Sequence, residues 1–386
     1  MVNSIALPRL MTVGGGALGT AAQAITTLGI RRPMVISDQF MERNGYVERL
    51  REILGDDGID VGVFCETVPD PTTDSLIPGL TAVAEHRADG LIGFGGGSAI
   101  DTAKALAVLA LNSEPMQSYK APNIYSGPAL PLIAIPTTAG SGSEVTRVTV
   151  ITDSATQEKM LCGGPSFQPL AAIVDYELTL SMPARLTADT GVDALTHAVE
   201  AYVSRKANAF TDALCLTAIS TIAANIRRVY EDGADLPARE AMMLAATQAG
   251  MAFSNSSVAL IHGMSRPIGG HFHVAHGLSN AMLFPVVTRY SVAGSPERYA
   301  DCARAMNLAT PQDDTETAVS TLINGIVELC GDLEVPTPKT YGISRTEWEQ
   351  LLPVMAREAL ASGSPANNPL IPDAETITEL YIDAYQ

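Results

Sequence analysis

The pattern of the chain changes near residue 180, and this change constrains its fold more than any other feature. Up to that point, short apolar runs rich in β-branched residues alternate with amphipathic stretches rich in alanine and leucine. Such alternation is typical of a parallel sheet with helices on both faces. The runs expected as strands are LMTV (10–13), PMVIS (33–37), VGVF (61–64), GLIGF (90–94), PLIAIP (131–136) and AAIVD (171–175).

After Pro183 the pattern becomes helical. Apolar residues recur at helical spacing over 210–230 and over 237–253. Thr187 is expected to cap an earlier helix that carries the sequence GVDALTHAVE. The sequence therefore predicts an α/β domain followed by an all-helical domain, and a chain of 386 residues is long enough for two cores.

Composition narrows the class of protein. The chain is 46% hydrophobic and 17% charged, as expected of a soluble globular protein, and no uninterrupted apolar stretch approaches the ~20 residues of a membrane helix. The N-terminal segment lacks the features of a signal peptide. Five scattered cysteines without a C-x-x-C pair favour reduced thiols in a cytoplasmic protein. The net charge of -18 would repel phosphate backbones, so we expect neither nucleic acid nor a membrane as a partner.

Five of the six histidines lie in one segment, together with a well-placed carboxylate. An Asp and a His four residues apart project from one face of a helix, although such a pair alone is usually an ordinary helix-face contact. The further histidines nearby favour a metal site, and this donor set suits iron or zinc better than calcium or magnesium. The proline and glycines of 267–270 are expected to place the later histidines on separate elements. The candidates are Asp193, His197, His262, His271, His273 and His276.

Two glycine-rich segments follow expected strands. Gly14, Gly16 and Gly19 match G-x-G-x-x-G, and Asp38 ends the next strand where a ribose-binding acid would lie. This motif is weak evidence by itself, because any tight turn from a strand into a helix gives the same spacing.

The second segment, LIGFGGGSAIDTAKALAVLA, is stronger evidence for a ligand loop. It runs from a strand into glycines 95–97 and opens a helix, whose free N–H groups and dipole would hold a pyrophosphate. The alternative is a flexible turn with Ser98 as N-cap. The polar residues Asp101 and Lys104 in the first turns favour the ligand loop. A third segment, IPTTAGSGSEVT, suits a ligand loop or a plain surface loop, and its hydroxyl residues are Thr137, Thr138, Ser141 and Ser143.

Four segments together resemble the iron-containing (group III) alcohol dehydrogenase family, and the likeness covers essentially the whole chain. They are GGGSAIDTAK, PTTAGSGSEVT, LTLSMPARLTADTGVDALTHAVEAY and HGMSRPIGGHFHVAHGLSNAMLFP. The resemblance implies a Rossmann-like dinucleotide-binding α/β domain over 1–180 and an all-α metal-binding and substrate-binding domain over 181–386. It further implies a cleft between the two domains, a homodimer, NAD as cofactor and Fe²⁺ as metal, with Zn²⁺ as the alternative.

The resemblance also assigns roles to individual positions. It implies metal ligation by Asp193, His197, His262 and His276. Phosphate binding is implied for Gly96, Gly97 and Ser98, with help from Asp101. Positions that line the cofactor match Thr137, Thr138, Ser141 and Lys159, with Asp38 beside the adenosine ribose and Asp70 nearer the adenine. The first glycine motif, at Gly14, is then a structural turn.

The chain departs from the family pattern beside the metal ligands. Several relatives carry a histidine where this chain has Arg266, and some are apolar or amide at the positions of His271 and His273. Arg266 lies one helical turn beyond His262, so its guanidinium is expected to reach the cleft and hold a substrate carboxylate. The alternative is that it pairs within its own protein. His271 or His273 is expected either to relay a proton or merely to line the cleft.

The expected function is therefore metal-dependent, NAD(H)-linked oxidation and reduction of a small alcohol or aldehyde. The substrate expected first is a hydroxy acid or semialdehyde, and a simple short-chain alcohol or diol comes second. One alternative is a lyase of the dehydroquinate-synthase type, which would need more basic residues than the lysine-poor second half offers. The other is a non-catalytic metal- or nucleotide-binding protein.

Overall fold

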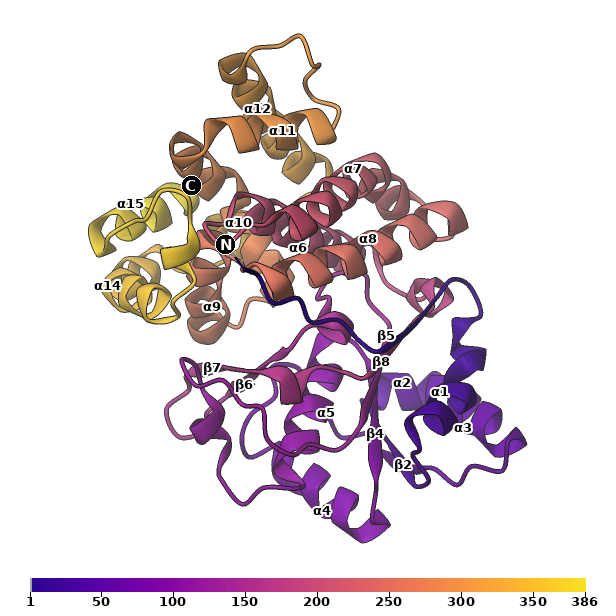
Figure 1. The fold of residues 1–386 in the computed structure, drawn as a ribbon. Helices are drawn as coiled ribbons and strands as arrows, with labels where there is room; N and C mark the ends of the chain where they lie inside the picture. The colour runs from indigo at the N-terminus through magenta and orange to yellow at the C-terminus, as the bar shows by residue number, and fades with distance from the viewer. Residues whose placement is uncertain (1) are drawn as a thin grey trace. The chain divides into compact units, whose positions relative to one another are not determined.

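The computed structural model describes residues 2–386, which form two compact units. One unit comprises Ser4–Ser181, and the other comprises Met182–Gln386 with Val2 and Asn3. Figure 1 shows the strands in the first unit and the long helices of the second.

The α/β unit contains a parallel sheet, which runs through all six segments predicted as strands. Every pairing between neighbouring strands of this sheet is parallel. In the order in which they pair, the strands are β3 (Gly62–Phe64), β2 (Pro33–Ile36), β4 (Gly90–Gly95), β5 (Leu132–Pro136), β8 (Ala171–Val174) and β1 (Leu10–Val13). A short antiparallel hairpin that the sequence did not predict joins β6 (Val148–Thr152) to β7 (Lys159–Gly163).

Helices cover both faces of the sheet, as Figure 1 shows. Because side chains alternate along a strand, Val35 packs into one core, whereas Met34 and Ile36 pack into the other. The core around Val35 is shared with α1 and α3, and the opposite core is shared with α4 and α5. The helices of this unit are α1 (Ala21–Leu28), α2 (Gln39–Arg43), α3 (Tyr46–Asp56), α4 (Leu76–His86) and α5 (Gly97–Leu109).

The order of the strands reverses between β2 and β4. From β2 the chain moves outward to β3 on one side, and it then returns to place β4 on the other side of β2. In parallel α/β sheets, ligands bind beyond the carboxyl ends of the strands at such a reversal. The residues that follow β2 and β4 are therefore the first candidates for a nucleotide site, whereas β1 lies at the far edge of the sheet.

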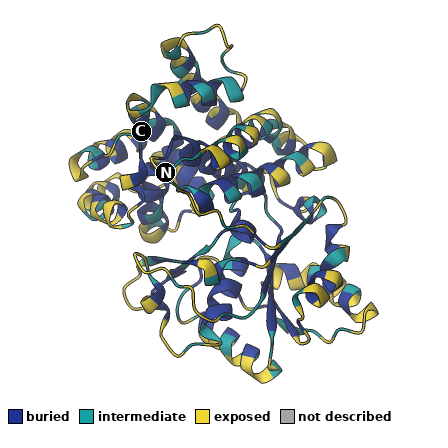
Figure 2. Cartoon of the chain, in the orientation of Figure 1, coloured by how far each residue is buried: buried dark blue, intermediate teal, exposed yellow. Residues whose placement is uncertain are grey.

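The second unit is helical, and α6 is its central element. Almost every residue of α6 from Thr187 to Val203 is buried, and α6 packs against α7, α8 and α10. Figure 2 shows buried residues concentrated at the centre of these helices. The helices are α6 (Ala184–Val203), α7 (Ala209–Glu231), α8 (Leu236–Asn255), α9 (Leu260–Phe272), α10 (His276–Ser291), α11 (Pro296–Ala305), α12 (Thr315–Asp332), α13 (Pro338–Tyr341), α14 (Arg345–Ala361) and α15 (Ala374–Ala384).

Two local predictions in this unit need correction. Thr187 does not cap α6, which starts at Ala184 after Pro183; its hydroxyl instead accepts a hydrogen bond from the buried Arg239. His262 and His276 lie on different helices, α9 and α10, as predicted, but the break between them falls at His273, which has a left-handed backbone, because α9 continues through Pro267 to Phe272.

By length and composition, α7 is apolar enough to cross a membrane, and it is the one such helix found in residues 2–386. This is weak evidence, because core helices of soluble proteins pass the same test. The helix buries one face, which includes Cys215, Ile219 and Ile226, and it packs against α6 and α8. Its N-terminus carries a capping box formed by Asn208 and Thr211. These contacts are those of a helix packed within a helical unit.

Candidate metal centre and dinucleotide site

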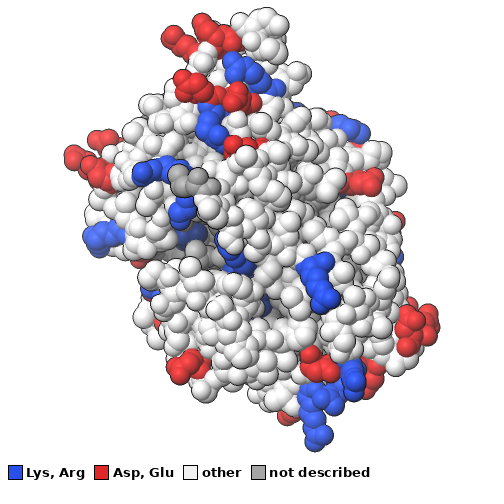
Figure 3. Space-filling view, viewed as in Figure 1, with Lys and Arg blue, Asp and Glu red and all other residues white. Residues whose placement is uncertain are grey.

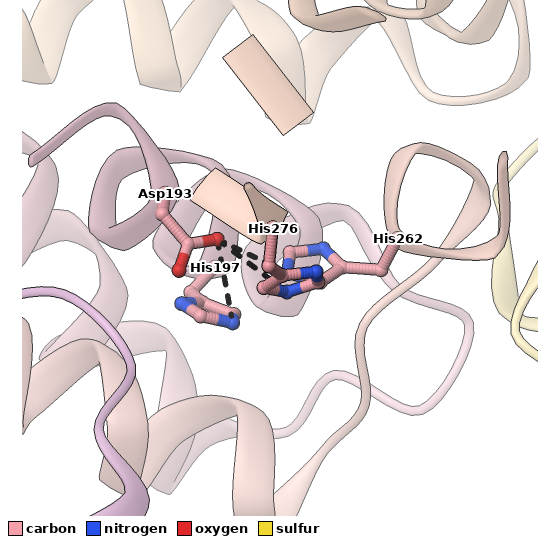
Figure 4. Close-up of side chains that lie close together, drawn as sticks. All are labelled: Asp193, His197, His262 and His276. Atoms are coloured by element: carbon pink, nitrogen blue, oxygen red, sulfur yellow. Dashed lines mark ion pairs between the residues drawn. The ribbon is translucent and has the colours of Figure 1, made fainter. Parts of the chain in front are cut away.

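Four predicted ligands from three helices converge in the helical unit. Their candidate donor atoms all lie within 4.8 Å of one another, and the residues are Asp193 and His197 from α6, His262 from α9 and His276 from α10. The carboxylate oxygen Oδ1 of Asp193 lies 3.9 Å from Nε2 of His197, 3.5 Å from Nε2 of His262 and 3.9 Å from Nε2 of His276. Figure 4 shows this carboxylate facing all three rings. One oxygen and three imidazole nitrogens form a donor set suited to a divalent transition metal.

Close packing places these helices at the required separation. A Cβ on Gly277, next to His276, would lie 2.6 Å from the carbonyl oxygen of Asp189 on α6. Only glycine therefore allows the start of α10 to approach α6 so closely. The ring of His197 is held between two others, stacking on Phe253 at 4.2 Å and on His262 at 4.4 Å between centroids.

The electrostatics of the tetrad favour a bound cation. Burial alone would raise the pKa of Asp193, but His197 and His276 hold it well below its usual range. Burial lowers the pKa of His262, whereas the carboxylates of Asp193 and Glu200 raise it. One carboxylate oxygen and three imidazole nitrogens are donors that a divalent transition metal accepts. The residues present therefore fit a divalent metal, which would be held by the tetrad and would act as a Lewis acid.

Two residues around the tetrad were missed by the sequence analysis. The side-chain nitrogen Nδ2 of Asn280 lies 2.7 Å from Asp193 Oδ1, 3.1 Å from His262 Nε2 and 3.3 Å from His276 Nε2. The buried amide oxygen of Asn280 has no hydrogen-bond partner among the described residues. Glu200 contacts the other ring nitrogen of His262, at 2.7 Å. Helical spacing carried a signal for both, because Glu200 follows His197 by three residues and Asn280 follows His276 by four.

In the α/β unit, the second glycine segment forms a strand-to-helix turn at the reversal point. Helix α5 begins at Gly97 with Gly96 as its N-cap, and no side chain caps it. The first N–H groups of a helix have no acceptor within the helix, so they are available to an anion. A Cβ on Gly97 would lie 3.1 Å from the Cβ and Oγ of Ser141. Thr137 and Thr138 follow β5, and the N–H of Thr137 donates to Gly95.

The remaining predicted cofactor residues lie around this turn. Ser98 Oγ accepts a hydrogen bond from the N–H of Asp70, and Asp70 forms a 2.9 Å ion pair with Lys159. Asp38 follows β2 and caps α2 by accepting from the N–H of Met41 with Oδ1. Its Oδ2 lies 3.5 Å from the position that a Cβ on Gly95 would occupy. The structure thus brings together residues that the sequence spreads over more than a hundred positions, and their contact with a cofactor stays a prediction.

Asp101 has a structural role in addition to the one predicted. It is half-buried, and its two carboxylate oxygens accept from Ser143 Oγ at 2.6 Å and from the N–H of Val150 at 2.9 Å. Lys104, which is fully buried, donates to Thr146 and to the carbonyl of Val148. Burial lowers the pKa of Lys104 to about 8, and the carboxylate of Asp101 opposes this shift. These residues tie α5 to β6 and to the loop that carries Ser141.

The first glycine motif is already occupied by the protein itself. The carboxylate of the fully buried Asp175 accepts hydrogen bonds from the N–H groups of Gly16 and Leu18. The loop lies beyond β1, at the edge of the sheet and away from the reversal point. It is therefore a structural turn, as the family resemblance implied.

The three residues predicted to be catalytic, Arg266, His271 and His273, are not members of the tetrad, and each has contacts of its own. The Arg266 guanidinium donates to Ser364 Oγ, and burial lowers its pKa to about 10, opposed by Glu200. Arg266 thus has a hydrogen-bond partner within its own protein. This contact gives less support to the prediction that Arg266 binds a substrate carboxylate. His271 is paired at the surface with Glu358, and His273 is exposed at the end of α9. Their roles in proton transfer stay predictions.

The structure therefore combines a parallel sheet, which has an uncapped helix N-terminus at its reversal point, with a helical unit in which one Asp and three His converge. Family models agree over nearly the whole chain. The model described as "Iron-containing alcohol dehydrogenase" matches residues 8–176, and "Fe-containing alcohol dehydrogenase family, C-terminal" matches residues 187–385. The chain belongs to the iron-containing alcohol dehydrogenase family.

Individual relatives support the same assignment. The chain is 34% identical to 1,3-propanediol dehydrogenase of Citrobacter freundii, over 98% of both chains. It is 34% identical to lactaldehyde reductase of Escherichia coli (strain K12), over 100% of both. Among solved structures, 1,3-propanediol oxidoreductase matches with a TM-score of 0.96 and 33% identity over 100% of both chains. The protein is therefore an alcohol or aldehyde oxidoreductase, and dependence on NAD and a metal is typical of its family.

Proposed function

We propose that the protein interconverts a short-chain, uncharged alcohol or diol and its aldehyde, with Fe²⁺ in the tetrad and NAD(H) as cofactor. The observation that carries the proposal is the convergence of one buried carboxylate, two buried imidazoles and the partly exposed imidazole of His276. A metal held there would polarise the aldehyde carbonyl, and the nicotinamide would supply hydride. Relatives named as dehydrogenases and reductases favour this chemistry over a lyase or a non-catalytic binding protein.

Asp38 supports NAD(H) over NADP(H). Its carboxylate follows β2 at the reversal point, where an acidic residue accepts from a ribose 2′-OH and repels a 2′-phosphate. Oδ1 is engaged in capping α2, which fixes the orientation of the side chain. Oδ2 is then the oxygen offered to the ribose.

The contacts of Arg266 support an uncharged substrate. An anionic substrate would need a guanidinium free to form a bidentate pair. Arg266 is instead half-buried, donates from one guanidinium nitrogen to Ser364 and lies close enough to Glu200 to feel its charge. The substrates in the names of the two curated relatives, 1,3-propanediol and lactaldehyde, are also small and uncharged.

The proposal also includes the identity of the metal ion, the cellular compartment and the oligomeric state. The family descriptions favour iron over zinc, although zinc stands higher in the affinity series and would compete for the same donors. Five free, buried cysteines within the described residues support a reducing, cytoplasmic setting. Figure 3 shows acidic side chains scattered over the visible face rather than gathered in one patch, and the net charge of -18 disfavours nucleic acid as a partner. The proposed assembly is a homodimer.

A matched pair of aldehydes tests this function. Protein loaded with Fe²⁺ or Zn²⁺ is assayed for NADH oxidation with butyraldehyde and with succinate semialdehyde, which differ by a terminal carboxylate. We expect kcat/KM to be higher for butyraldehyde, and the reverse reaction to proceed with 1,3-propanediol. A preference for the semialdehyde would support an anionic substrate in place of an uncharged one. If metal-loaded protein turned over no small aldehyde, the proposed function would be contradicted.

A further inference from the structure

Glu200 lies behind the metal ligands, and neither the sequence analysis nor the family resemblance assigned it a role. It sits on α6 one turn after His197, and only 2% of its surface is exposed. A buried carboxylate is costly unless its oxygens are paired. The partners of Glu200 come from the start of α9, about sixty residues further along the chain.

Both oxygens of Glu200 accept hydrogen bonds from backbone N–H groups. Oε2 lies 2.8 Å from the N–H of Ala259, and Oε1 lies 2.6 Å from the N–H of Ile261. These groups are at the N-terminus of α9, where Ala259 offers no side-chain cap of its own. Glu200 therefore caps α9 from another helix and fixes the position of the ligand that α9 carries.

The same carboxylate reaches the ring of that ligand. Glu200 Oε2 lies 2.7 Å from Nδ1 of His262, a distance typical of a strong hydrogen bond. Both oxygens of Glu200 already accept from backbone N–H groups, so Glu200 is the acceptor here as well, and Nδ1 is the nitrogen that carries the ring proton. The other nitrogen, Nε2, is then left with its lone pair on the side that faces Asp193. This is the tautomer that a metal requires of the ring.

We propose that Glu200 is a positioning residue for the metal, which holds His262 in the Nδ1–H tautomer and fixes its orientation from the N-terminus of α9. The inference rests on the metal-dependent function proposed above. The carboxylate acts through His262 and does not itself touch metal or substrate. Its contribution should therefore appear first in metal affinity and in the state of one imidazole ring.

Substitution by glutamine isolates this role because it preserves size. In Glu200→Gln, one of the two oxygens becomes an NH₂ group, which can only donate. If the NH₂ group faces His262, it donates to Nδ1, and the ring proton is then carried by Nε2. A protonated Nε2 cannot bind the metal. If it faces Ile261, it opposes a backbone N–H and loosens the start of α9. Either placement disturbs one of the two functions of the native carboxylate.

The experiment measures Zn²⁺ affinity by chelator competition in the full chain, in four forms. These are wild type, Glu200→Gln, His262→Ala and the double variant. We expect Glu200→Gln to weaken binding about 10- to 100-fold, the range typical of partners behind a metal ligand. In the His262→Ala background the same substitution should change affinity less than about threefold, because the residue through which Glu200 acts is missing.

Two further measurements separate this role from a general loss of stability. Asp314→Ala removes an N-cap from α12 in the same unit, so it should lower Tm and leave zinc affinity unchanged. Nitrogen-15 NMR of the metal-free protein, which has only six histidines to assign, should show His262 protonated at Nδ1 in wild type and shifted toward Nε2 in Glu200→Gln.

The outcomes distinguish this inference from the proposed function. If wild type binds no divalent metal, the proposed function fails. If wild type binds metal but Glu200→Gln binds it equally well, the role of Glu200 is wrong while the function stands. An equal loss of affinity in the wild-type and His262→Ala backgrounds would also overturn the inference, because Glu200 would then act by another route.

Discussion

The metal centre and the dinucleotide end of the sheet are built from different chemical groups. At the metal centre, four side chains from three helices supply the donor atoms, and a change in any one removes a ligand. At the proposed dinucleotide end, the groups available to an anion are backbone N–H groups at the start of α5, with Ser141 packed close to Gly97. We therefore expect side-chain deletions to abolish metal binding, whereas the nucleotide site should respond to changes that displace the backbone.

A second comparison lies within the α/β unit, between its two glycine segments. Both follow a parallel strand and both open a helical turn. In the first, the N–H groups of Gly16 and Leu18 are bound by the protein's own Asp175. In the second, no side chain caps the helix. The difference teaches that a glycine motif shows where N–H groups converge, while the surrounding chain decides whether they remain available to a ligand.

The largest effect is expected from removing a metal ligand. Loss of a residue that hydrogen-bonds to a metal ligand weakens metal affinity ~10–100-fold. His276→Ala removes a ligand itself, so it should weaken metal affinity by more than this and should abolish nearly all activity. NADH affinity should stay unchanged, because the nucleotide-binding residues belong to the other unit. Elemental analysis and NADH fluorescence titration measure the two properties. His273→Asn is the control, since His273 lies outside the tetrad and asparagine tolerates its left-handed backbone.

An intermediate effect is expected from a side chain at the second glycine loop. In Gly97→Val, the new atoms would press on Ser141 and displace the first turn of α5. Loss of one charge-assisted hydrogen bond to the pyrophosphate, about 1.5–3 kcal/mol, should raise the Kd for NADH roughly 10- to 100-fold. Metal content should remain that of wild type.

The matched control for this variant lies in the first glycine loop. Gly19→Ala adds a methyl group where nothing lies within 4 Å and where the backbone is not left-handed. Its effect on NADH affinity should be negligible. A large effect at Gly19, or none at Gly97, would reverse the comparison between the two loops.

A smaller effect is expected in cofactor preference. Asp38→Asn keeps a side chain that can cap α2 but removes the charge that would repel a 2′-phosphate. The ratio of kcat/KM for NADH to that for NADPH should fall by about tenfold, the size of one charge-assisted contact. Thermal unfolding should show Tm close to that of wild type. Equal use of NADPH by wild type would contradict the role of Asp38.

The smallest effect on selectivity is expected at Arg266. Because its guanidinium is bonded to Ser364, Arg266→Met should change kcat/KM for butyraldehyde and for succinate semialdehyde by similar factors. A selective loss of about 10- to 100-fold for the semialdehyde would instead reveal a charge-assisted substrate contact. A Ser364→Ala variant separates loss of this hydrogen bond from loss of charge.

Much of this architecture could be predicted from the sequence because its signals are local. The apolar runs marked the strands of the parallel sheet, and the crowding of histidines marked the metal segment. The β6–β7 hairpin was missed because polar residues interrupt its strands. Thr187 was misplaced as a cap because its hydroxyl was taken to serve its own helix, whereas it accepts from Arg239 of α8.

The partners of the site residues could not be predicted, because they depend on contacts far apart in the chain. Glu200 looked like one more residue of an amphipathic helix until α9 placed His262 against it. Asp175 likewise looked like a polar residue at the end of a strand, yet it is the acceptor that occupies the first glycine loop. Spacing also placed Arg266 on the same helical face as His262, but only packing showed that Ser364 is its partner.

Metal removal and restoration test the central claim most directly, namely that the Asp193–His197–His262–His276 tetrad holds the metal on which the reaction depends. The purified protein is stripped with a chelator, and its metal content, NADH affinity and aldehyde reduction are measured before and after Fe²⁺ is returned anaerobically. We predict that the stripped protein still binds NADH, loses nearly all activity, and recovers it on addition of about one Fe²⁺ per chain. Full activity in protein shown to be metal-free would contradict the account.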